Sequence, residues 1–206
     1  TTLFRSGRAE QALAAKSALL QEVDHRVKNN LQLISSLMLL QSRRAGSEAA
    51  TAALRRMLER VSAVAAVHRR LFQGERFDRF ELGPFVGELV EDLSRNQRGL
   101  RIDAELEPVE IPASHAAPMA LIVSELVTNA LRHAYPGGEG EVRVALRRLD
   151  DGMELTVADS GVGAGAAPAG FGLTIAELLC RQVRGRLELE SGHPGLRARL
   201  VFGQAE

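Results

Sequence analysis

Four polar side chains fall on one face of a helix that the sequence predicts over residues 114–134. Glu125 and Asn129 stand four residues apart, and Arg132 and His133 follow one turn later. A carboxylate, a carboxamide and a cation in this arrangement suit a magnesium-bound polyphosphate, because the amide oxygen can ligate the metal and the cation can contact phosphate. A solvated helix face accounts for the same residues, so this helix alone leaves both interpretations open.

Glycines surround an acidic residue at the end of a later predicted strand. In ADSGVGAG, Asp159 ends the strand, and Gly161 and Gly163 let the backbone approach a ligand closely. A carboxylate at that position can accept a hydrogen bond from an exocyclic amine such as that of adenine. An ordinary turn would explain this stretch by itself, but its combination with the polar helix and a further glycine stretch favours a nucleotide site.

The further glycine stretch is GFGL, at residues 170–173, and it opens another predicted helix. The free N–H groups and the dipole of a helix N-terminus favour phosphate, so Gly170, Gly172 and Leu173 are candidate nucleotide-binding residues. A dinucleotide fingerprint does not fit the earlier glycines, because an Asp-Ser pair intervenes and no βαβ unit surrounds them. No Walker-type GxxxxGK[ST] sequence is present, which excludes a P-loop.

A histidine stands at the front of an amphipathic helix near the start of the chain, in EVDHRVKNNLQLISSL. An ordinary imidazole is mostly neutral at pH 7, so one nitrogen of His25 is a nucleophile without a strong base. Asp24 can fix the tautomer, while Arg26 and Lys28 can offset the charge of an incoming phosphate. An arbitrary helix histidine is more often a solvated residue, and here the surrounding motif reverses that expectation.

Two helices must position this histidine. Residues 8–44 contain no Gly or Pro, and their apolar residues step by three and four, which predicts one long helix. Gly46 and Ser47 supply a C-cap and an N-cap, and a second helix is predicted over about 49–72. The broad apolar face of this antiparallel hairpin predicts pairing with a second copy into a dimeric four-helix bundle.

A mixed pattern of helices and strands follows the hairpin. We predict helices over 82–96, 115–134 and 172–185, and strands over 98–107, 141–149, 153–160, 186–192 and 196–203. This order predicts an α/β sandwich, with helices on one face of a mixed, mostly antiparallel sheet. The expected domains are therefore residues 1–75 and 76–206.

Composition narrows the classes of partner. Lys plus Arg equals Asp plus Glu at 26 each, so we expect no nucleic-acid partner. A single cysteine, Cys180, favours a reducing, cytoplasmic compartment. No apolar run approaches the roughly 20 residues of a membrane span, and the first residues do not resemble a secretory signal. The helix-like start without an initiator Met suggests that further residues precede these.

The motifs resemble those of sensor histidine kinases. SELVTNALRHA is similar to the N box of the GHKL-type ATP-binding domain, DSGVG to its first glycine box and GFGL to its second. HRVKNNLQLI, at residues 25–34, resembles the signature of the HisKA type-2 family, whose relatives are the HWE kinases. The absence of tryptophan favours the type-2 assignment. The resemblance covers nearly the whole chain, in two independent halves.

The resemblance implies a kinase core that uses ATP and Mg²⁺ to phosphorylate His25. The phosphoryl group would then pass to an aspartate in the receiver domain of a response regulator, as in two-component signalling. A homodimer and an upstream sensory domain are also implied. The alternatives are a histidine phosphotransferase with a degenerate ATP site, or a GHKL ATPase or serine kinase of the anti-sigma type.

Residue roles follow from the same resemblance. Asn129 would ligate magnesium, Glu125 would orient groups around the phosphates, and Arg132 stands where the family has a phosphate-contacting lysine. The other implied roles are: His133 shaping this helix face, Asp159 accepting from the adenine amine, Gly161 and Gly163 lining the base, and Gly170, Gly172 and Leu173 flanking a lid. The chain departs from the pattern in a short lid without basic residues, 164–169, and in Leu196, where the family has threonine.

Overall fold

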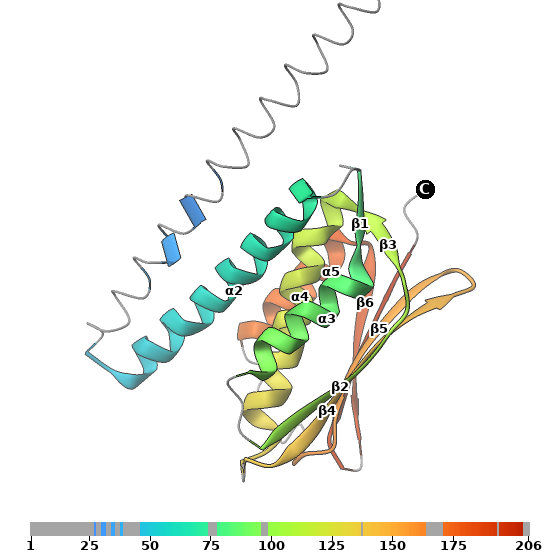
Figure 1. Cartoon of the computed structure of the whole chain (residues 1–206). Coiled ribbons are helices and arrows are strands. Elements are labelled where there is room, and N and C mark those ends of the chain that lie inside the picture. The colour runs from blue at the N-terminus through green and yellow to red at the C-terminus, as the bar shows by residue number, and fades with distance from the viewer. Residues whose placement is uncertain are drawn as a thin grey trace, which may run out of the picture. The chain divides into compact units, whose positions relative to one another are not determined.

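The structure is a computed structural model (Figure 1). It describes residues 27, 30, 31, 34, 35, 38, 46–73, 78–95, 99–136, 138–163, 171–192 and 194–203. The chain divides into two compact units, Thr1–Glu75 and Arg76–Glu206. None of the helices among these described residues has both the length and the apolar character needed to cross a membrane.

The first unit contains helix α2, Glu48–Gln73, close to the predicted 49–72. Ser47 caps it as expected: its Oγ accepts a hydrogen bond from Ala50 N at 3.2 Å. Glu48 in the first turn and Arg70 in the last complement the helix dipole. The long helix predicted over 8–44 lies mostly outside the described residues, and the residues described within it are helical.

The second unit is built on a five-stranded sheet with the order β2-β4-β5-β7-β6. The strands are β2 Leu100–Leu106, β4 Gly140–Leu149, β5 Gly152–Asp159, β6 Gly185–Ser191 and β7 Leu196–Phe202. β2 runs parallel to β4, and the other neighbours are antiparallel. The prediction of a mixed, mostly antiparallel sheet is confirmed.

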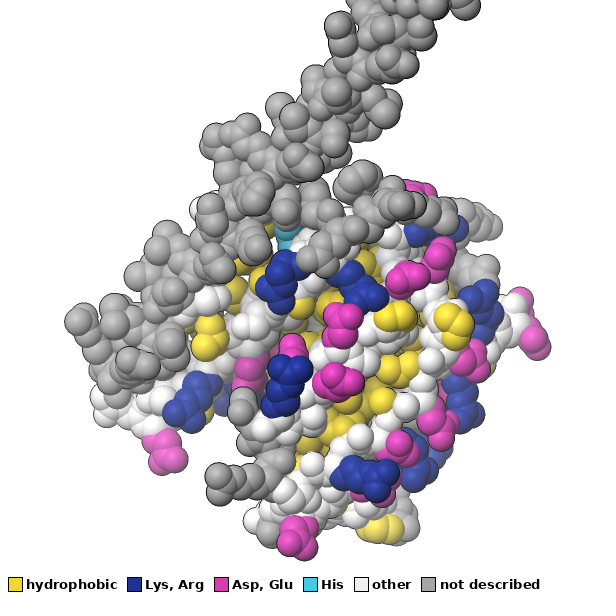
Figure 2. All heavy atoms as spheres, viewed as in Figure 1, with side chains coloured by type: hydrophobic (Ala, Val, Ile, Leu, Met, Phe, Trp, Pro, Cys, Tyr) yellow, Lys and Arg dark blue, Asp and Glu magenta, His cyan; other side chains and the backbone are white. Residues whose placement is uncertain are grey.

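Three helices form a layer over one face of this sheet: α3 Leu82–Ser94, α4 Ala113–His133 and α5 Phe171–Gln182 (Figure 1). Strand alternation turns Leu146, Leu155 and Leu200 toward this layer, and all three are fully buried. The predicted α/β sandwich is therefore confirmed. Acidic and basic side chains are interspersed over the face of the molecule seen in Figure 2.

A two-stranded antiparallel sheet, which the sequence pattern did not predict, joins β1 Arg79–Glu81 to β3 Glu110–Pro112. Phe80 and Ile111 face each other across it and are both buried. The ring of Phe85 meets the ring of Phe80 edge-on, with centroids 5.1 Å apart. Strands of three residues are too short to show alternation, which explains the omission.

One predicted helix end is wrong. The helix expected over 172–185 ends at Gln182, and β6 already begins at Gly185. The left-handed position at this helix end is taken by Arg184, with φ 51°, rather than by the following glycine.

Candidate nucleotide-binding site

The polar face predicted on the N-box helix lies on the C-terminal half of α4. Glu125 is buried, Asn129 is half-buried, and Arg132 and His133 are exposed. The face therefore runs from the interior to the surface within three turns. A Cβ added to Gly172, in the first turn of α5, would overlap Glu125 Oε2. The structure thus brings together two motifs that are far apart in the sequence.

Ala134, the C-cap residue of α4, holds the turn that contains Gly161 and Gly163. Val162 N donates to Ala134 O at 2.9 Å, and a Cβ at Gly161 would overlap the Ala134 carbonyl. Because no other residue lacks a Cβ, only glycine permits this approach at position 161.

Asp159 lies at the end of β5, on the helix-covered face, in register with the buried Leu155 and Val157. Its side chain is half-buried. Oδ1 accepts hydrogen bonds from Gly161 N at 3.0 Å and from Leu196 N at 3.3 Å. Two backbone donors therefore fix one carboxylate oxygen and leave Oδ2 as an acceptor for a ligand.

Gly195, which directly precedes β7, lies against Asp159. Gly195 has φ 98°, and a Cβ there would overlap Asp159 O. Gly163, with φ 76°, lies against the carbonyl of Gly195. Glycine is favoured at both positions, since a side chain would be strained at these positive φ angles, and at position 195 it would also overlap the Asp159 backbone.

Leu196 contributes in a way that its side chain does not reveal. The sequence suggested only the loss of a threonine hydroxyl at this position, whereas the structure shows the Leu196 backbone N–H bound to Asp159. Tyr135, which the sequence reasoning also missed, contacts Ser160 beside this turn. A sequence signal did exist for it, since Tyr135 directly follows the predicted N-box helix.

Several predicted site residues lie outside the described part of the chain: Asp24, His25, Arg26, Lys28 and Gly170. Gly172 is half-buried and Leu173 is buried, so Leu173 packs in the interior of the unit. The ligand-binding role of each remains a prediction.

A surface hollow of about 470 Å³ lies on the other face of the sheet. Its lining is mostly charged and includes Arg143, Arg147, Glu154 and Arg199. Strand alternation places these side chains away from the helical layer, whereas Gly161 and Val162 lie against Ala134 at the end of α4. Asp159 and Ser160, at the end of β5, also line the hollow. The candidate nucleotide site is therefore the group of glycine turns beside α4, and it adjoins this hollow at Asp159.

The fold and these glycine turns define the class of protein. Residues 115–204 match the family described as histidine kinase-, DNA gyrase B- and HSP90-like ATPase. Residues 22–97 match a second family model, HisKA type 2, described as histidine kinase. The chain belongs to the histidine kinase family, as the motifs of the sequence suggested.

Known relatives agree with this assignment. The chain is 31% identical over 180 residues to the sensor histidine kinase PdtaS of Mycobacterium tuberculosis, an alignment that covers 85% of this chain. It spans only 35% of the length of that relative.

Two solved structures share the fold. The histidine kinase domain of a blue-light-activated kinase from Erythrobacter litoralis superposes with a TM-score of 0.66 at 23% identity, over 91% of each chain. The ATP-binding domain of PrrB from Mycobacterium tuberculosis superposes with a TM-score of 0.54 at 21% identity. That match covers 62% of this chain and 97% of the PrrB domain.

Proposed function

We propose that this chain is the catalytic core of a sensor histidine kinase, which phosphorylates itself on His25 at the expense of ATP. The observation that carries the proposal is the half-buried Asp159, whose Oδ1 is fixed by two backbone N–H groups beside the N-box helix. It occurs in a chain that also carries the histidine kinase helical segment. A response regulator would then receive the phosphoryl group on an aspartate.

The glycine turns fit an adenine nucleotide. Oδ2 of Asp159 would accept from the exocyclic amine, and Gly161 and Gly163 would lie along the base, because the chain carries no side chain there. The resemblance implies that Gly170, Gly172 and Leu173 flank a lid, residues 164–169. An acceptor for the amine and a backbone free of side chains are the features that an adenine ring requires.

The C-terminal half of α4 fits the phosphate end. Asn129 would ligate magnesium through its amide oxygen, and Arg132 and His133 lie further out on the same helix. The buried Glu125 would orient groups around the phosphates. Magnesium, when bound, would neutralise charge on the phosphate oxygens.

The acceptor histidine would work by alignment. A neutral nitrogen of His25 would attack the γ-phosphorus, and ADP would leave. Asp24 would hold the imidazole tautomer, and Arg26 and Lys28 would offset the charge of the transferred group. The resulting phosphoramidate is the donor for the aspartate of a receiver domain.

We further propose a homodimer built through the helical hairpin, with domains 1–75 and 76–206 in these separate roles. Along α2, Leu58, Val61 and Leu71 are only half-buried and Met57 is 45% exposed. A second copy would cover these apolar side chains in a four-helix bundle. An upstream sensory domain and a cytoplasmic location remain predictions.

The test is incubation of the chain with magnesium and γ-labelled ATP. We expect acid-labile label that is absent from His25→Ala and Asn129→Ala and retained by His68→Ala, a matched histidine control on α2. Acid-stable label would contradict the proposal and indicate a serine kinase. A chain that takes up no label and binds no ATP would instead be a phosphotransferase.

A further inference from the structure

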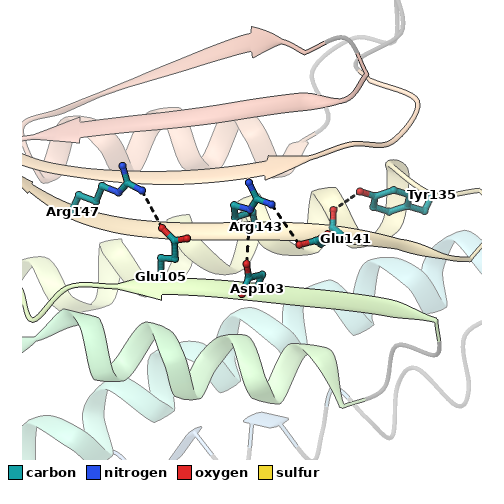
Figure 3. A network of polar contacts seen from close by, with 6 residues as sticks. All are labelled: Asp103, Glu105, Tyr135, Glu141, Arg143 and Arg147. Carbon is teal, nitrogen blue, oxygen red and sulfur yellow. Dashed lines mark hydrogen bonds and ion pairs between the residues drawn. The ribbon is translucent and has the colours of Figure 1, made fainter.

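One tyrosine hydroxyl lies where strands β4 and β5 part. The antiparallel ladder ends at the pair Val142–Asp159, so Glu141 and Ser160 would be the next pair. These two residues do not complete the ladder. Instead, Tyr135 Oη accepts a hydrogen bond from Ser160 N at 2.9 Å. It donates one to the carbonyl oxygen of Glu141 (Figure 3). The hydroxyl therefore takes the place of a strand-to-strand hydrogen bond.

Both the hydroxyl and the ring of Tyr135 are held in place. A phenol has one donor and two acceptor positions, and Ser160 Oγ, at 3.2 Å, can supply the second donor. The ring lies against the start of β4, where a Cβ added to Gly140 would overlap it. Glycine at position 140 thus makes room for the ring, and the ring places the hydroxyl between the strands.

The path of the chain after Ser160 depends on this separation of the strands. Beyond Ser160, Gly161 packs on Ala134 and Val162 N donates to Ala134 O at 2.9 Å. The N–H of Gly161 is also one of the two donors to Asp159 Oδ1. Ala134 and Tyr135, which are adjacent in sequence, therefore hold consecutive residues of the turn that orients the Asp159 carboxylate.

We propose that Tyr135 is a positioning residue that sets Asp159 for recognition of an exocyclic amine on the nucleotide base. This inference rests on the proposed function. Without the hydroxyl, Ser160 N can bond directly to the Glu141 carbonyl, so that the ladder gains one pair. Ser160 is then drawn toward β4, and the Gly161 N–H moves away from Asp159. The loss therefore falls on the contact to the amine and spares the phosphate end of the site.

The experiment compares two nucleotides on the full chain: ATP, and purine riboside triphosphate, which lacks the exocyclic amine. We expect Tyr135→Phe to raise the Kd for ATP about tenfold and to change the Kd for the amine-free nucleotide by less than about twofold. In an Asp159→Asn background, Tyr135→Phe should change the Kd for ATP by less than about twofold, because both changes act on one contact.

A second variant moves the hydroxyl by displacing the tyrosine ring. Gly140→Ala keeps the hydroxyl and displaces the ring, so it should reproduce the ATP-specific loss and keep the inference testable if Tyr135→Phe fails to fold. Equal losses for the two nucleotides, or no loss for either, would overturn the inference. Failure of the wild-type chain to bind ATP would overturn the proposed function as well, whereas ATP-selective binding that Tyr135→Phe leaves unchanged would overturn the inference alone.

Discussion

The two faces of the five-stranded sheet differ in burial and in charge. The face under the helices carries Leu146, Leu155 and Leu200, all of them fully buried. The opposite face carries charged residues in register across the strands, such as Glu154 on β5 and Arg147 on β4. Each strand therefore places one set of side chains in the core and the other at the surface.

The outer face is held together by ion pairs between neighbouring strands. Arg147 lies 3.0 Å from Glu105, and Arg143 lies 3.9 Å from Asp103 (Figure 3). Arg199 pairs with Glu154, and its hydrogen bond to that carboxylate raises the pKa of its guanidinium above the usual value. These pairs are solvent-accessible, so water and salt weaken them.

Stability and candidate chemistry come from different parts of the sheet. The buried apolar face supplies most of the stabilisation, because it removes the larger apolar area from water. The exception on that face is Asp159, a half-buried carboxylate at the end of β5. An acidic group retained beside an apolar layer and held by two backbone donors is a candidate for function rather than for stability.

Neighbouring residues of β5 provide the sharpest test of the difference between the faces. Leu155→Asp would bury an unpaired charge and should destabilise the chain by more than about 4 kcal/mol. Thr156→Asp, one residue further on the outer face, should change the free energy of unfolding by less than about 1 kcal/mol. Urea unfolding followed by circular dichroism measures both. Similar losses in the two variants would show that the outer face is also packed.

The single thiol extends the comparison to the helical layer. Burial, with a smaller contribution from Glu177, raises the pKa of Cys180 to about 11. At pH 8 its alkylation should be about a hundredfold slower than in the urea-unfolded chain, where the thiol has its ordinary pKa. As pH rises, the thiol loses its proton in the unfolded chain before it does so in the folded chain, which favours unfolding. The stability that the neutral Cys180 thiol contributes is therefore present below about pH 9 and is lost as pH rises toward 11. Rapid alkylation of the folded chain would contradict the burial.

The role of the inner-face carboxylate of Asp159 can be separated from that of a carboxylate on the outer face. Asp159→Asn should weaken ATP binding about tenfold to a hundredfold, because the amide presents the wrong group to the base amine. Glu154→Gln, on the outer face of the same strand, is the matched control and should bind ATP as the wild type does. Isothermal titration gives both affinities, and equal losses would place the nucleotide elsewhere.

The smallest effect is expected from an outer ion pair. Glu105 and Arg147 are each more than half exposed, at 59% and 58%. A double-mutant cycle with Glu105→Gln and Arg147→Gln should give a coupling of about 0.2–1 kcal/mol that disappears in 1 M salt. A larger, salt-insensitive coupling would mean that this face is shielded from water.

Alternation and glycine spacing predicted much of the fold and of the candidate site. The period of two in residues 141–149 and 153–160 gave β4 and β5 nearly to the residue, because one face is buried and the other is charged. Gly161 was identified because a close approach of backbone requires glycine, Asp159 because a carboxylate at a strand end can accept from an amine, and Gly172 because it opens a helix. Their convergence with Glu125 and Ala134 agrees with that reasoning.

The features that were missed depend on backbone groups or on distant pairing. Leu196 acts through its N–H, which every residue except proline carries, so residue type gave no signal. The contacts of Tyr135 depend on the register between β4 and β5. The parallel pairing of β2 with β4 likewise joins strands separated by a whole helix. Short-range periodicity carries no information about such partners.

That parallel pairing also has a consequence for the order of folding. β4–β5 and β6–β7 are hairpins closed by short turns, whereas β2 reaches β4 only after the chain has passed through α4. Closing the longer loop costs entropy before any contact compensates for it. We expect the hairpins to form first and β2 to join last. In partial denaturant, the amides of β2 should then exchange with solvent before those of β5, so unfolding would begin at the sheet edge that carries Asp103 and Glu105.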